Sequence, residues 1–126
     1  MGLLDGLLGN ASQIDSEEVQ QELQPILADE ENVVFAVKEI RDMYVFTNYR
    51  LILIDKQGVT GRKVEYHSVP YRAITHFKLE TAGHFDLDAE LKIWISGSSE
   101  PIERELKSGD TTLGIQKALA NFAIKK

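Results

Sequence analysis

FTNYRLILIDKQGVTGRKVEYHSVPY, residues 46–71, holds two apolar runs separated by a turn with two glycines. Branched and aromatic runs on either side of such a turn are typical of a β-hairpin. The turn also gathers Lys56, Arg62 and Lys63, which makes it a candidate contact for an anion or for anionic lipid. We interpret the glycines as turn positions, because no helix follows to offer its amides to a phosphate.

Strand-like runs continue on both sides of this stretch, with Gly, Pro, Asn and Asp at the turns between them. Seven strands are predicted, over Asn32–Glu39, Met43–Thr47, Tyr49–Lys56, Val64–Val69, Ile74–Thr81, Leu87–Ile95 and Ile102–Lys107. We expect Asn48 to serve the turn between the second and third strands. We expect Arg50 to pair with a carboxylate.

Helices are predicted before and after the strands. Residues 111–124 place apolar side chains at helical spacing, with Asp110 as a candidate N-cap. Residues 16–24 form a second helix, which Asp15 caps and Pro25 ends. The acidic run that follows, residues 29–31, is expected to form a solvated loop.

Two leucine pairs near the start of the chain lie one helical turn apart, at Leu3, Leu4, Leu7 and Leu8. Their apolar face is expected to dock on the domain or on a sister subunit. Insertion into a membrane surface is the alternative, although no Lys or Arg precedes Lys38 to form the basic face that such helices carry.

The chain has 126 residues, a net charge of −6 and no cysteine. Its length fits one domain, and without cysteine it has no disulfide, thiolate metal site or thiol nucleophile. The acidic charge disfavours nucleic acid as a partner. No run is long enough for a transmembrane helix and the start lacks the features of a secretory signal, so a cytoplasmic location is expected.

The order of elements resembles the pleckstrin-homology fold. The residues from Phe46 to Asp55, the two turn glycines, Lys63 and the run from Ser68 to Tyr71 are similar to the bacterial pleckstrin-homology family. The resemblance implies a mainly β fold: a seven-stranded bent antiparallel barrel capped by a C-terminal helix. Residues 1–30 would be a helical N-terminal extension and residues 31–126 the domain. Family members are thought to form rings, and the family implies no established ligand or activity.

The first predicted hairpin, residues 37–43, lacks the spaced basic residues that hold phosphoinositides in lipid-binding members of this fold, and Glu39 and Asp42 offset its two cations. The three histidines match no zinc spacing, and no nucleophile elbow or paired carboxylates in a pocket are recognisable. We therefore expect no cofactor, no metal and no catalysis.

The first three strands are apolar on both faces, and an exposed apolar face of this size requires a cover. The cover is either the N-terminal helices or another subunit. We expect a homo-oligomer, in the form of a ring, with other proteins as further partners. Its candidate interface comprises Leu3, Leu4, Leu7, Leu8, Val34, Tyr44, Phe46, Ile52 and Ile54. The sequence thus predicts a non-catalytic scaffold or interaction module; the alternative is a membrane adaptor that binds anionic lipid through Lys56, Arg62 and Lys63.

Overall fold

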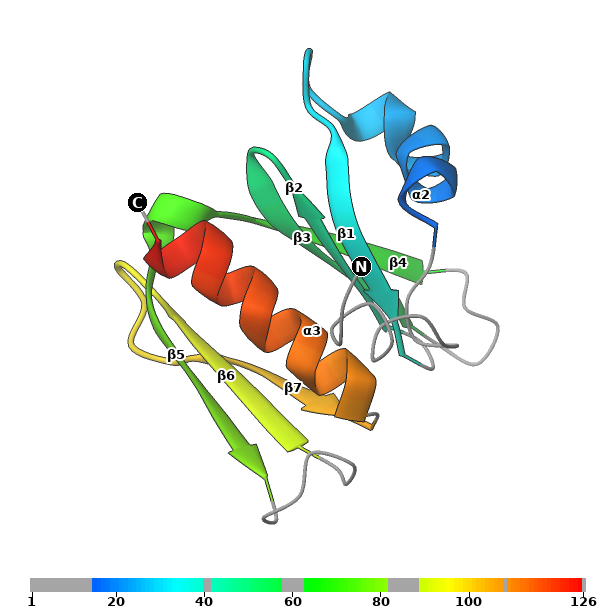
Figure 1. Ribbon diagram of the computed structural model, residues 1–126. Helices are drawn as coiled ribbons and strands as arrows, with labels where there is room; N and C mark the ends of the chain where they lie inside the picture. Colours follow the sequence, from blue (N-terminus) through cyan, green and yellow to red (C-terminus); the bar gives the residue numbers. More distant parts are fainter. Residues whose placement is uncertain (1–14, 40–41, 58–62, 82–88, 108, 126) are drawn as a thin grey trace.

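The computed structural model describes residues 15–39, 42–57, 63–81, 89–107 and 109–125 (Figure 1). The helices are α2 (Ser16–Leu23) and α3 (Gly109–Leu119). The strands are β1 (Val33–Lys38), β2 (Asp42–Thr47), β3 (Arg50–Gln57), β4 (Lys63–Pro70), β5 (Ile74–Thr81), β6 (Ala89–Ile95) and β7 (Ile102–Leu106). All seven predicted strands are present, with ends that coincide with the predicted ones or differ by at most two residues.

The strands form two antiparallel sheets, one in the order β1-β2-β3-β4 and the other β5-β6-β7. Helix α3 packs on β1 of the first sheet and on β7 of the second, so it covers one open side between them (Figure 1). Two antiparallel sheets closed by a C-terminal helix confirm the predicted mainly β fold class.

The main core lies between the two sheets and α3. Phe46, 0% exposed, stacks at 6.1 Å on Phe122, which stacks in turn at 4.9 Å on Tyr71. Ile115 and Leu119 of α3 are buried in the same cluster. The α-helix ends earlier than predicted, at Leu119, and the chain continues with π-helical winding over Ala120–Ile124.

The start of α3 also differs from the prediction. The helix begins at Gly109, so Asp110 lies inside the first turn and is not the residue that precedes the helix. At the other end of the chain the predicted cap is confirmed, because the Asp15 carboxylate accepts a hydrogen bond of 2.9 Å from the Glu17 N–H. Pro25 follows α2 within a single 3₁₀ turn, Gln24–Ile26.

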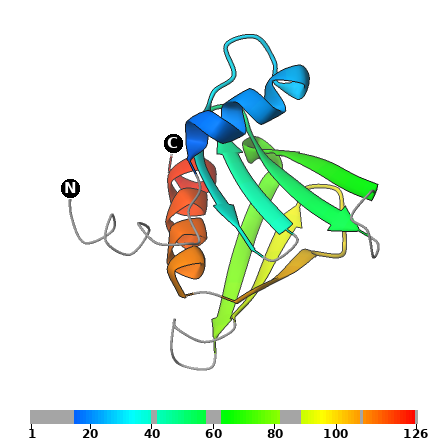
Figure 2. The ribbon, with the colours of Figure 1, turned by 90° about the vertical axis from the view of Figure 1, so that its right-hand side faces the viewer.

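The second face of the first sheet is covered by α2 (Figure 2). Val19 and Leu23, 3% and 5% exposed, pack in one cluster with Ala36, Val45, Ile52 and Ile54. Each of the two helix residues gains about 1.5–3 kcal/mol from this burial. Of the two covers that the sequence left open, the helix is therefore the one that hides this apolar face.

This burial corrects four residues of the predicted oligomer interface. Tyr44 and Phe46 point into the main core, and Ile52 and Ile54 lie under α2; each is at most 5% exposed. All four are core residues of a single chain. The first sheet has a core on each of its two faces, so neighbouring apolar residues on one strand are buried in different cores. Val34 is exposed, at 53%. The four leucines of the predicted interface lie outside the described residues.

Candidate functional site

The turn between β2 and β3 is built around a buried carboxylate. The Glu31 side chain is 0% exposed and accepts hydrogen bonds from the Ala28 N–H at 2.8 Å and the Thr47 hydroxyl at 2.7 Å. Arg50 donates to both carboxylate oxygens, from Nε at 2.8 Å and Nη2 at 3.0 Å. The predicted pairing of Arg50 is confirmed. The solvated loop predicted for residues 29–31 is wrong at Glu31, which turns inward to this guanidinium.

Two further donors of Arg50 are used within the chain. Nη1 donates to the Ser68 hydroxyl and Nη2 to the Ile26 carbonyl, both at 2.8 Å. Burial by itself raises the pKa of the Glu31 carboxyl. The hydrogen bonds from Arg50, Ala28 and Thr47 lower this pKa, and together they outweigh the effect of burial, so the pKa lies below its ordinary value. The guanidinium is therefore a structural link between β3, β4 and the segment after α2.

Asn48 and Tyr71 complete this structural network. The Asn48 side chain accepts from the Asn32 N–H at 2.7 Å and donates to the Glu30 carbonyl at 3.0 Å. It thereby supports Glu30 in the left-handed region, at φ 64°. The Tyr71 hydroxyl donates to the carbonyls of Thr47 and Arg50, at 2.6 and 2.8 Å. Five of the residues that carry the family resemblance thus make polar contacts with the chain itself around this turn: Thr47, Asn48, Arg50, Ser68 and Tyr71.

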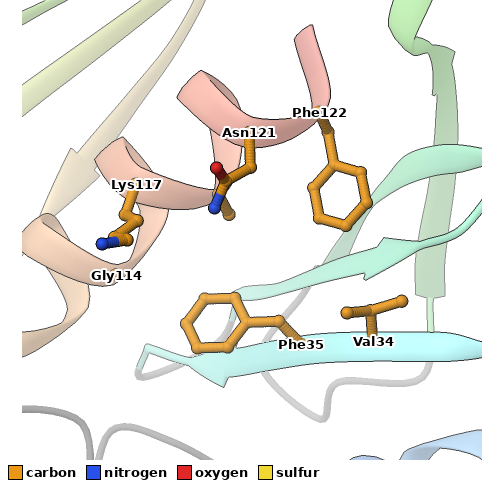
Figure 3. A pocket seen from close by; sticks show the side chains of 7 residues that line it. Val34, Phe35, Gly114, Lys117, Asn121 and Phe122 are labelled. Atoms are coloured by element: carbon orange, nitrogen blue, oxygen red, sulfur yellow. The ribbon is translucent and has the colours of Figure 1, made fainter. Parts of the chain in front are cut away.

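An apolar groove opens between β1 and α3 (Figure 3). Its volume is about 220 Å³, and its walls are Val34 and Phe35 on the strand and Ala118, Asn121 and Phe122 on the helical side. Figure 3 shows the Val34 side chain and the Phe122 ring directed into the space between the two elements. Gly114 and Lys117 of α3 complete the lining, and Lys117 supplies its one charge.

A β-bulge explains why Val34 faces this groove. Val33 pairs with Thr47 and Phe35 with Phe46, so Val34 is the extra residue between two consecutive partners on β2. A bulge leaves such a residue unpaired and bends the strand locally. Strand β1 is also one of the two edge strands of its sheet, with β2 as its neighbour. The groove therefore combines an exposed apolar side chain with a sheet edge, two features that suit a polypeptide ligand.

Sequence reasoning identified Val34 but not the helical side of the groove. The signal for the helical side was present in the amphipathic pattern of residues 111–124, where Phe122 continues the apolar stripe. Because Phe122 is only half-buried, it contributes both to the core and to the groove wall.

The ends of β1, β2 and β3 carry carboxylates. Asp42 and Asp55 are partners across β2 and β3, and Glu39 accepts from the Lys107 N–H at 3.2 Å. Burial raises the pKa of Glu39 and, together with the hydrogen bond to Asp55, that of Asp42. The Tyr44 hydroxyl beside them is buried with no hydrogen-bond partner in the described part of the chain. This end of the two sheets therefore carries a cluster of acidic side chains.

The basic candidates lie near the tips of β3 and β4. Lys56 and Lys63 are exposed on these neighbouring strands. Asp55 and Glu65, which are partners in the register, lie one and two positions from these lysines in the sequence, so the two basic residues alternate with acidic ones. Arg62 lies outside the described residues.

Among the residues that the structure describes, no group of three His, Asp or Glu side chains is placed to hold a metal ion. In the same part of the chain, no helix is long and apolar enough to span a bilayer.

Comparison with known proteins places this geometry in a family. The family model described as bacterial PH domain matches residues 2–123. The pleckstrin homology domain from Shewanella amazonensis SB2B shares 60% identity, with 97% of this chain and 98% of that chain covered and a TM-score of 0.84. A DUF1696 family protein with a pleckstrin-homology domain from Shewanella loihica PV-4 shares 62% identity, with 90% and 97% covered and a TM-score of 0.78. The uncharacterized protein YjqA of Bacillus subtilis (strain 168) is 54% identical, with 95% of this chain and 97% of YjqA covered.

Proposed function

Since this chain belongs to the bacterial pleckstrin-homology domain family, whose fold is generally a non-catalytic module, we propose that it is a non-catalytic scaffold that acts as a homo-oligomer, in the form of a ring. Its subunits associate with one another and present repeated surfaces to other proteins, so that weak individual contacts add up through multivalency. We place this scaffold in the cytoplasm, a reducing compartment that a chain without cysteine suits.

The observation that carries the proposal is the groove between β1 and α3. A half-exposed valine, at 53%, stands beside a hollow of about 220 Å³ that is lined mainly by apolar groups. Isolated apolar side chains are common on protein surfaces, but an apolar hollow next to one favours a protein ligand. The apolar outer face of β2 and β3 no longer supports association, because α2 covers it.

The membrane adaptor has less support. Acidic residues neighbour Lys56 and Lys63, and carboxylates also occupy the ends of β1, β2 and β3. An anionic surface would meet these negative charges together with the few positive ones.

The molar mass in solution tests the proposal. Multi-angle light scattering at micromolar concentration is expected to give a multiple of the 14.2 kDa chain mass that does not change on dilution over a tenfold range. A mass of one chain at every concentration would overturn the homo-oligomer.

A further inference from the structure

We propose that the groove between β1 and α3 binds the N-terminal leucine segment, residues 3–8, of a second copy of this chain. The inference rests on the proposed homo-oligomer and names the contact that joins its subunits. Three properties of the groove and the segment support it: apolar complementarity, complementary charge and reach.

The apolar side chains of the leucine segment match the groove in chemical character and in size. The segment repeats a leucine pair after four residues, Leu3/Leu4 and Leu7/Leu8, so in a helix these side chains would form one apolar face. The groove presents Val34, Phe35 and Phe122 to such a face. A volume of about 220 Å³ is enough for one or two leucine side chains and too small for a folded element.

The charges are complementary as well. Residues 1–14 contain one charged side chain, Asp5, between the two leucine pairs. The groove lining also contains one, Lys117, of opposite sign and exposed. When the leucines enter the hollow, Asp5 can remain at its rim opposite this lysine, an arrangement that favours one orientation of the segment.

The segment is long enough to reach a neighbour. The described chain begins at Asp15, so fourteen residues precede it. Fully extended, they would span up to about 46 Å. A domain of this length has a radius of gyration of about 14 Å. The arm can therefore leave its own domain and reach the groove of an adjacent copy.

The two surfaces lie in different parts of the sequence, and this determines the type of assembly. A segment that binds a different surface on the next copy makes a head-to-tail contact, which is repeated from subunit to subunit. Such contacts close into a ring when the rotation between neighbours allows it. A self-complementary patch would instead give a closed dimer.

A complementation experiment tests the assignment. Leu4→Asp with Leu7→Asp disables the arm and leaves the groove intact; Val34→Glu disables the groove and leaves the arm intact. Each variant alone is expected to run at the mass of one chain, 14.2 kDa. Their equimolar mixture is expected to give twice that mass, because the intact arm of one variant binds the intact groove of the other and no further contact can form.

Ile26→Glu is the matched control, since it adds the same charge at an exposed apolar position, 42% exposed, outside the groove. It is expected to keep the wild-type mass. Circular dichroism and the unfolding midpoint check that each variant is folded. If Ile26→Glu dissociates the assembly as fully as Val34→Glu, the groove has no specific role and the inference is wrong.

Engineered cysteines separate binding to a second copy from binding within one chain. The chain has no cysteine of its own, so a Leu7→Cys chain and an Asn121→Cys chain can be mixed and oxidised. A disulfide between the two different chains is the expected product. If the wild type is an oligomer while both disabling variants keep its mass, the inference fails and the proposed homo-oligomer stands. If the wild type is a single chain, the proposed function fails first. A disulfide that forms only when both cysteines are in one chain would show binding within the chain.

Discussion

At the scale of single residues, Glu31 is the group on which the turn between β2 and β3 depends. Glu31→Gln removes the charge that Arg50 faces and leaves the guanidinium with a weaker acceptor. We expect a loss of about 3 kcal/mol in the free energy of unfolding, measured by urea denaturation at pH 7. Glu30→Gln, on an exposed neighbour, should change it by less than about 0.5 kcal/mol. Equal effects of the two substitutions would contradict the network.

The pH dependence of the same comparison follows from the lowered pKa of Glu31. A carboxyl whose pKa is lower in the folded state contributes stability above its ordinary pKa, and the contribution disappears as the pH falls through the folded value. The gap in unfolding free energy between wild type and Glu31→Gln should therefore be full at pH 7 and narrow below about pH 4. A gap that stays constant from pH 7 to pH 3 would show that the loss is one of packing alone.

At the scale of secondary-structure elements, α2 acts as the cover of the first sheet. Leu23→Ala should lower the free energy of unfolding by about 2–4 kcal/mol, because it leaves a cavity over the outer face of β2 and β3. Gln21→Ala, on the exposed side of the same helix, is the control and should stay within about 0.5 kcal/mol. Similar small effects for both would mean that α2 is dispensable as a cover.

The facing carboxylates of β2 and β3 predict a stabilising substitution. Asp42 and Asp55 are cross-strand partners, and burial with the neighbouring Asp55 raises the pKa of Asp42. Because the pKa of Asp42 is higher in the folded state than its ordinary value, the charge on Asp42 costs stability at high pH, and this cost falls as the pH drops and Asp42 takes up a proton. Asp42→Asn should raise the free energy of unfolding by about 0.5–1 kcal/mol at pH 7 and by less at pH 4.5. Adding Asp55→Asn should give little more, because either substitution removes the repulsion.

The periodicity of the sequence was sufficient to locate these helices and strands, but not to predict what packs against each of them. Alternation and turn residues located every strand to within two residues, since those signals are local. The partner of Arg50 could not be chosen among twenty acidic residues, because Glu31 is brought to it by the return of the chain after α2. The role of Ile52 and Ile54 was ambiguous for the same reason. A strand that is apolar on both faces indicates that a cover exists, and the sequence alone did not decide between a helix of the same chain and a neighbouring subunit.

At the scale of the whole molecule, the net charge favours the proposed scaffold over the membrane adaptor. A net charge of −6 repels an anionic bilayer, and a ring of identical subunits would multiply that repulsion with every copy added. For the adaptor to bind, the attraction of the lipid for Lys56, Arg62 and Lys63 in several copies would have to outweigh this repulsion. Each basic residue near the surface contributes about 1 kcal/mol of attraction.

Sedimentation with phosphatidylserine-containing vesicles at 0.15 M salt measures the balance, and we expect less than a tenth of the protein to sediment with the lipid. The same result is expected for the variant in which Lys56, Arg62 and Lys63 are all changed to Glu, with neutral vesicles as the reference. Binding that grows at low salt and disappears in this variant would instead favour the adaptor. The acidic neighbours on β3 and β4 are the same in the wild type and in this variant. Such binding would therefore also show that the three clustered cations outweigh the repulsion from the net negative charge of the chain.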